Sequence, residues 1–139
     1  MLRQVHDHIV SELGQSSRTD TIFVVTAVVF NLIVLGINSA VSLAATERSA
    51  AASNDVILAV FIVMTLLLNG VAVTALVFGM RTRRTLLSGL VSMYRDNEVD
   101  QYYDPTLMSN YGVRYLLFAG VIVTLAVTAI VVPLIIRFV

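Results

Sequence analysis

The stretch VILAVFIVMTLLLNGVAVTALVFGM, from Val56 to Met80, decides the fold of this chain. It holds 25 residues without a charged side chain, between Asp55 and Arg81. An α-helix of that length extends about 37 Å, which exceeds the roughly 30 Å hydrocarbon core of a bilayer. The stretch therefore predicts a transmembrane helix that crosses with some tilt or extends beyond one boundary.

Two further runs have the same character. Thr21 to Thr46 holds 26 residues without a charge, and Tyr115 to Ile136 holds 22. The polar connection between the first and second runs is short, so we expect those two spans to form an antiparallel helical hairpin. The fold class that follows is an all-α integral membrane protein with three transmembrane helices.

Composition agrees with one small membrane domain. The chain has 139 residues, 58% of them hydrophobic. All nine basic residues are Arg and nine residues are acidic, so the formal charge is zero and nothing favours nucleic acid as a partner. The exclusive use of Arg favours a prokaryotic origin. Cysteine is absent, which excludes disulfides and thiol chemistry.

The polar N-terminal segment has the period of an amphipathic helix. Its apolar residues recur every three or four positions: Leu2, Val5, Ile9 and Leu13. We expect a short helix that lies along the membrane surface or on partner helices. Gly14 is expected to end it, and Thr19 or Asp20 to cap the following helix.

The segment after the second span is the longest polar stretch. Its apolar residues keep a helical spacing, which predicts that the second helix continues beyond the bilayer until the acidic run that starts at Asp96. Asp104 and Pro105 are typical of the start of another helix. The predicted organisation is a single domain over 1–139: an amphipathic N-terminal helix at 1–18, spans at 21–45, 56–80 and 113–137, and a cytoplasmic segment with a helical extension at 81–112.

The arginines predict the orientation. With the N-terminus and the segment between the second and third spans in the cytoplasm, seven arginines lie inside and two outside. We therefore expect a multi-pass protein of the inner (plasma) membrane, with a cytoplasmic N-terminus and an outer C-terminus. All five tyrosines fall in the inner segment, where we expect them to anchor at the headgroup level.

Amide and hydroxyl groups are the polar chemistry available inside the spans. Asn31 and Asn69 each lie about ten residues from the inner end of their helix, at roughly the same depth. Asn38 and Ser42 extend the face of Asn31 into a polar stripe. These four residues are either interhelical polar contacts or the lining of a water-filled pore, and the sequence leaves both alternatives open.

Other polar groups give weaker indications. Five arginines are expected to contact anionic lipid headgroups or a partner: Arg81, Arg83, Arg84, Arg95 and Arg114. Four acidic residues have part of the spacing of a calcium loop but lack its glycine and its final glutamate: Asp96, Glu98, Asp100 and Asp104. His6 and His8 are two apart and do not share a helix face, so we expect solvated side chains. No catalytic grouping or cofactor motif is recognisable, and we expect neither an enzyme nor a cofactor.

Two functions from different classes follow from this pattern. The first is a channel-like homo-oligomer that forms a pore or conduit along the polar stripe. The second is a non-conducting accessory or assembly subunit of a larger membrane complex, in which the same residues hold helices together. In both cases we expect contact with the lipid bilayer and self-association or binding to other membrane subunits.

Overall fold

The computed structural model describes residues 2–47, 52–99, 101 and 106–138. It contains three long helices: α1 over Leu2–Glu47, α2 over Ala52–Asp96 and α3 over Thr106–Phe138. Each is long and apolar enough to cross a membrane. The prediction of an all-helical protein with three candidate membrane spans is therefore confirmed.

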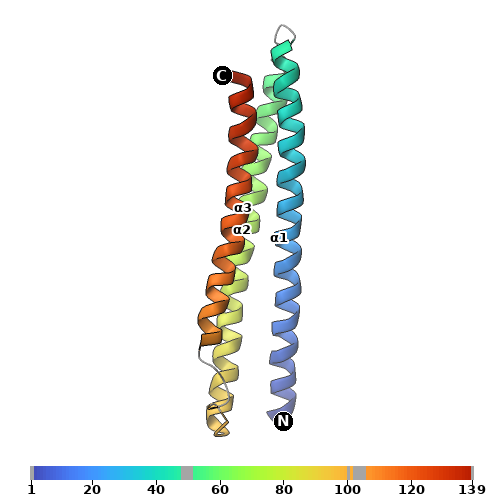
Figure 1. The fold of residues 1–139 in the computed structure, drawn as a ribbon. Coiled ribbons are helices and arrows are strands. Elements are labelled where there is room, and N and C mark those ends of the chain that lie inside the picture. The colour runs from blue at the N-terminus through green and yellow to red at the C-terminus, as the bar shows by residue number, and fades with distance from the viewer. Residues whose placement is uncertain (1, 48–51, 100, 102–105, 139) are drawn as a thin grey trace.

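The helices form one elongated bundle in which α1 and α3 run in the same direction and α2 runs against both (Figure 1). The lower end in Figure 1 holds the start of α1 and the end of α2, and the upper end holds the end of α1, the start of α2 and the C-terminus. Every helix contacts the other two. The expected antiparallel hairpin of the first two spans is thus present.

α1 differs from the prediction because it does not break at its N-terminal side. The helix runs for 46 residues, about 69 Å, straight through Gly14. Thr19 Oγ1 bonds to the Gln15 carbonyl oxygen and Thr21 Oγ1 to that of Ser17, as in a helix interior. The predicted stop at Gly14 and cap at Thr19 or Asp20 are therefore wrong, and the N-terminal segment extends α1 alongside the end of α2 instead of forming a separate helix (Figure 1).

α2 continues past its apolar span and ends at Asp96, as the acidic run predicted. Its end is closed by Val99 N donating to the Tyr94 carbonyl at 3.0 Å and Glu98 N donating to the Arg95 carbonyl at 3.1 Å. Glu98 has a φ of 57°. This is a Schellman motif with glutamate at the left-handed position that usually holds glycine. The predicted helix start at Asp104 and Pro105 lies outside the described residues.

The buried residues follow the spacing of a coiled coil. On α1 and α2, successive buried residues are three, four or seven positions apart, which keeps one side of each helix towards the bundle axis. The apolar core cluster lies within the membrane-spanning part and combines all three helices: Ala27, Ala72, Leu76, Tyr115 and Ile122. Large apolar side chains such as Leu66 and Leu116 face outward. Lipid tails are as apolar as these side chains, so the outward face of each helix can be as apolar as the face that packs in the core.

Candidate functional site

An amide pair joins α1 and α2 in the middle of the bundle. Asn31 Nδ2 donates to Asn69 Oδ1 at 2.7 Å, and Asn69 Nδ2 donates back to Asn31 Oδ1 at 2.8 Å. Asn69 Nδ2 also bonds to the Thr65 carbonyl at 2.7 Å. Asn31 is 1% exposed and Asn69 7%. The two amides that the sequence places at equal depth thus face each other within one chain.

The upper part of the polar stripe is buried but lacks this pairing. Asn38 and Ser42 lie on α1 inside the bundle, at 0% and 1% exposure. Among the described residues, neither the Asn38 amide nor the Ser42 hydroxyl has a hydrogen-bond partner. The three stripe residues of α1 and Asn69 of α2 therefore face the interior of this chain's bundle, not a surface that a second copy could share.

A carboxylate and a phenol meet at the lower boundary of the apolar part. The Tyr115 hydroxyl on α3 donates to Asp20 Oδ2 on α1, and both residues are buried. The backbone of Gly79 on α2 lies against the other carboxylate oxygen of Asp20. One polar contact thus joins α1 to α3. It fits because the residue of α2 next to it is glycine, which has no side chain. Asp20 is a buried interhelical group, not the cap predicted for it.

Arg83 adds a buried positive charge near this contact. Its side chain is 4% exposed, and its Nη2 donates to the Leu13 carbonyl at 3.1 Å. Its guanidinium carbon lies 5.1 Å from the Tyr111 ring centroid and 5.8 Å from that of Tyr115, which are cation–π distances. Nε of Arg83 has no hydrogen-bond partner among the described residues. Tyr115 therefore contacts both an acidic and a basic side chain in the interior.

These positions correct two predictions. Arg83 does not face lipid headgroups, because its side chain turns into the bundle, whereas Arg81, Arg84, Arg95 and Arg114 are exposed. Tyr115 is 5% exposed and belongs to the core cluster, so it does not anchor at the headgroup level. In both cases the amphipathic side chain contacts a residue on another helix instead of the membrane interface. Tyr102 and Tyr103 lie outside the described residues.

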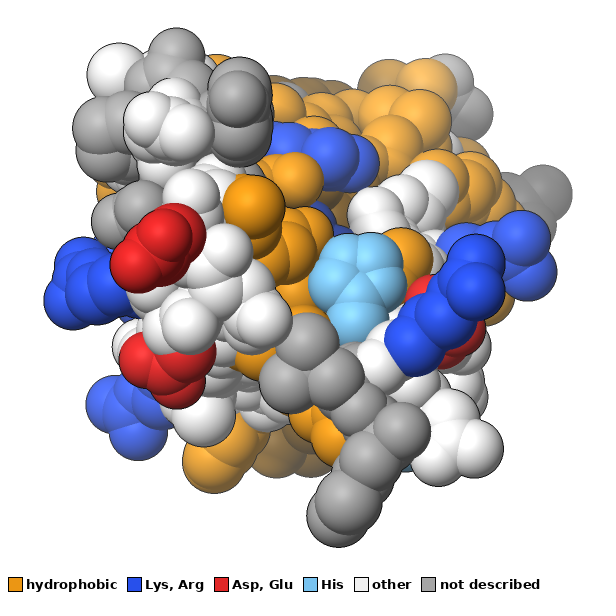
Figure 2. All heavy atoms as spheres, turned by 90° about the horizontal axis from the view of Figure 1, so that it is seen from below, with side chains coloured by type: hydrophobic (Ala, Val, Ile, Leu, Met, Phe, Trp, Pro, Cys, Tyr) orange, Lys and Arg blue, Asp and Glu red, His pale blue; other side chains and the backbone are white. Residues whose placement is uncertain are grey.

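Histidine and tyrosine join the extensions of α1 and α2 below the apolar part. His6 Nε2 lies 3.1 Å from the Tyr94 hydroxyl, and the two ring centroids are 5.9 Å apart. His6 is therefore not the freely solvated side chain that we expected. Figure 2 shows the lower end of the bundle, where charged side chains of both signs surround a more apolar centre with a histidine facing the viewer. The extensions are thus packed together and polar at their rim.

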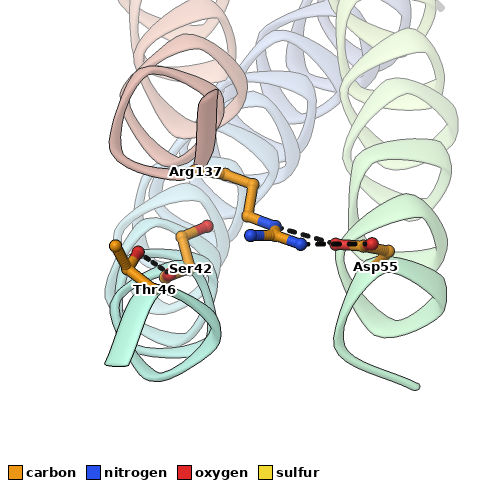
Figure 3. A network of polar contacts seen from close by, with 4 residues as sticks. All are labelled: Ser42, Thr46, Asp55 and Arg137. Carbon is orange, nitrogen blue, oxygen red and sulfur yellow. Dashed lines mark hydrogen bonds and ion pairs between the residues drawn. The ribbon is translucent and has the colours of Figure 1, made fainter. Parts of the chain in front are cut away.

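An ion pair joins α2 and α3 at the upper end. Arg137 Nε lies 2.9 Å from Asp55 Oδ1, and its Nη2 lies 3.3 Å from Asp55 Oδ2 (Figure 3). Ser42 lies at the same end, where its carbonyl accepts a hydrogen bond of 2.9 Å from Thr46 Oγ1. The two charged residues that flank the second and third charge-free runs on this side thus fix those helices against each other.

Metal chemistry finds no support in the described part of the chain. No group of three or more His, Asp or Glu side chains is placed there to hold a metal ion. Asp96 and Glu98 are exposed and belong to the end of α2, and Asp100 and Asp104 lie outside the described residues. The partial calcium-loop spacing therefore corresponds to the end of a helix at the positions that can be described.

Sequence reasoning missed the contact of Asp20, Gly79 and Tyr115. A signal was present, because Asp20 directly precedes the first charge-free run and Tyr115 begins the third. With the predicted topology, both ends lie at the same membrane boundary, so their side chains are at one depth. The same matching of depths identified Asn31 and Asn69. Gly79 gave no signal, because a glycine in a membrane helix has many roles.

The fold and its interior define a class: a small all-helical membrane protein with three spanning helices and a polar seam inside one chain. A scan against protein-family models and searches of curated proteins and of solved structures return no match to this chain.

Proposed function

We propose that this protein is a non-conducting, non-catalytic subunit that helps to assemble a membrane complex. The observation that supports it best is that the polar stripe of α1 and its partner amide on α2 face the interior of the bundle. Asn31, Asn38, Ser42 and Asn69 are all buried between the helices of one chain, with exposures from 0% to 7%. A pore between copies of the chain would need such groups on an outward face, where this protein presents apolar side chains.

The outer surface supports assembly with other helices. Three pairs of small residues lie four positions apart on exposed faces: Gly36 with Ala40, Gly70 with Thr74, and Gly120 with Thr124. A Cβ atom added at any of these three glycines would meet nothing within 4 Å. Small residues at this spacing allow close approach of a neighbouring membrane helix. We expect self-association or contact with other membrane subunits on these faces.

The proposal includes a location for the polar extensions. The exclusive use of Arg favours a prokaryote, and hence its inner membrane. The distribution of the arginines favours an orientation with the lower end of the bundle in the cytoplasm. The amphipathic start of α1 and the extension of α2 would then form a cytoplasmic stem, held by the contact of His6 with Tyr94. Such a stem is a suitable surface for a cytoplasmic partner of the complex.

Current recordings test the proposal directly. Purified protein is reconstituted in planar bilayers, and its assembly state is measured by native mass spectrometry in mild detergent with co-purifying chains retained. We expect no single-channel currents, and an assembly with itself or with another membrane protein. Reproducible currents whose conductance changes in Asn31→Leu, but not in the outward-facing Leu66→Ala control, would show a pore and overturn the proposal.

A further inference from the structure

A cleft on the outer side of the bundle separates α2 from α3. Its volume is about 320 Å³, within the usual range for ligand pockets. One end is apolar, with Leu76 and Val77 from α2 and Leu116 and Ala119 from α3. The other end holds Arg84 and Gly112. The cleft therefore changes from apolar to cationic along its length.

The change in polarity coincides with a change in the surroundings. On α2 the charge-free run ends at Met80, and on α3 it begins at Tyr115. Both borders line the middle of the cleft, because Met80 and Tyr115 belong to its wall. The apolar end thus lies at the depth of the hydrocarbon, and the cationic end at the depth of the lipid headgroups.

Arg84 is well placed to bind an anion at this end. Its side chain is exposed, and Nη2 lies against the backbone of Gly112 on α3, 3.2 Å from where a Cβ atom would be. Gly112 thus lets the guanidinium reach across from α2 to α3. Arg81 follows Val77 by one turn on the same face of α2, so a second exposed guanidinium lies near the same boundary.

We propose that this cleft binds one acidic phospholipid, with an acyl chain along Leu76, Val77, Leu116 and Ala119 and its phosphate at Arg84 and Arg81. Guanidinium groups form bidentate contacts with phosphate. Charge complementarity selects an anionic headgroup over a zwitterionic one, because the ammonium group of a zwitterionic headgroup cancels the phosphate charge beside the two guanidinium groups. The apolar end selects a lipid over a free phosphate ester. Arg83, which directly precedes Arg84, takes no part because it is buried against Leu13 and Tyr111.

Native mass spectrometry of the purified full chain tests the site. The protein is titrated with phosphatidylglycerol and, separately, with phosphatidylcholine carrying the same acyl chains. We expect one phosphatidylglycerol to bind with clear preference, and Arg84→Gln to weaken its affinity about fivefold, the typical effect of one cationic contact at an anionic membrane surface. Arg18→Gln is the matched control. Arg18 is exposed on α1, two residues before Asp20, which contacts Gly79, so it lies near the depth of Arg81.

Two further measurements separate the parts of the site. Ala119→Phe fills the apolar end and should abolish specific binding while both arginines remain. Glycerol 3-phosphate should not compete, since it lacks the acyl chain. Equal binding of the two lipids, equal effects of Arg84→Gln and Arg18→Gln, or competition by glycerol 3-phosphate would each overturn the site. Currents through the protein would overturn the proposed function and leave this site untouched.

Discussion

Gly79 of α2 lies directly against the Asp20 carboxylate of α1, with no space for a side-chain carbon between them. The other oxygen of the same carboxylate accepts the hydrogen bond from Tyr115 of α3. The glycine on α2 therefore provides the space in which α1 and α3 make their polar contact.

Gly79→Ala is expected to destabilise the protein. The added Cβ would overlap Asp20 Oδ1, and the short Asp20 side chain can yield only by giving up its bond to Tyr115. Overpacking of this kind costs about 1–3 kcal/mol. Thermal unfolding in detergent, followed by circular dichroism, measures it. Gly89→Ala on the same helix is the control, since space there is open, and it should be neutral or stabilise by up to about 1 kcal/mol. Equal unfolding temperatures for the two variants would contradict the packing described.

Tyr115→Phe is expected to lower stability more than Tyr111→Phe. The first change leaves the buried Asp20 carboxylate without its hydroxyl donor, which costs about 1–3 kcal/mol. The second keeps the ring on which Arg83 lies and removes a hydroxyl that has no hydrogen bond to the described residues. The same unfolding assay compares them. A larger effect at Tyr111 would place the important polar contact elsewhere.

The amide pair predicts an asymmetry between two substitutions. Asn69→Leu leaves the Asn31 amide buried with no partner, whereas Asn31→Leu leaves Asn69 with its bond to Thr65. The first should therefore cost more, within the roughly 1–3 kcal/mol range of an unsatisfied buried polar group. In the double variant the costs should not add, with a coupling of about 1 kcal/mol. Additive losses in a denaturation series would mean that the amides do not interact.

The end of α2 predicts a stabilising substitution. Glu98 has a left-handed backbone, which costs a residue with a side chain roughly 1 kcal/mol and glycine almost nothing. Glu98→Gly should raise the unfolding temperature. The neighbouring Asn97→Gly should not, because the Asn97 Nδ2 bond to the Met93 carbonyl is lost and no strain is relieved. A lower unfolding temperature for Glu98→Gly than for the native chain would be inconsistent with this helix end.

The proposed orientation predicts where a thiol reagent reaches the chain. The sequence has no cysteine, so single substitutions report one site each. Ser11→Cys lies on the exposed start of α1, and Ser53→Cys near the exposed start of α2. In intact cells, a membrane-impermeant maleimide should label the second and not the first, and permeabilisation should expose both. Labelling in the opposite order would reverse the orientation.

The sequence was sufficient for the spans because a bilayer constrains them strongly. Long runs without charge have few alternatives to a membrane helix. The equal depth of Asn31 and Asn69 predicts that they lie close together, as their hydrogen bonds show. The extension of α2 to Asp96 followed from its helical spacing. Each of these features is local or depends on depth alone.

The sequence did not reveal which side of each helix faces inward. In a membrane, both the core and the lipid are apolar, so Leu76 in the core and Leu66 on the surface have the same hydropathy. α1 continues unbroken through Gly14, next to the point where Arg83 of α2 bonds to the Leu13 carbonyl, and a contact with another helix is not contained in local signals. Arg83 and Tyr115 resemble interface residues until their partners on other helices are known.

The continuity of α1 has a mechanical consequence. A helix without a break at the membrane boundary has no hinge there, so its polar start and its apolar span must tilt and rotate as one rod. α2 is equally unbroken across the same boundary. A sideways displacement of the stem near His6 and Tyr94 would therefore move the opposite end of α2, where Asp55 pairs with Arg137 of α3. A change in bilayer thickness would change the tilt of both helices and with it the position of the stem.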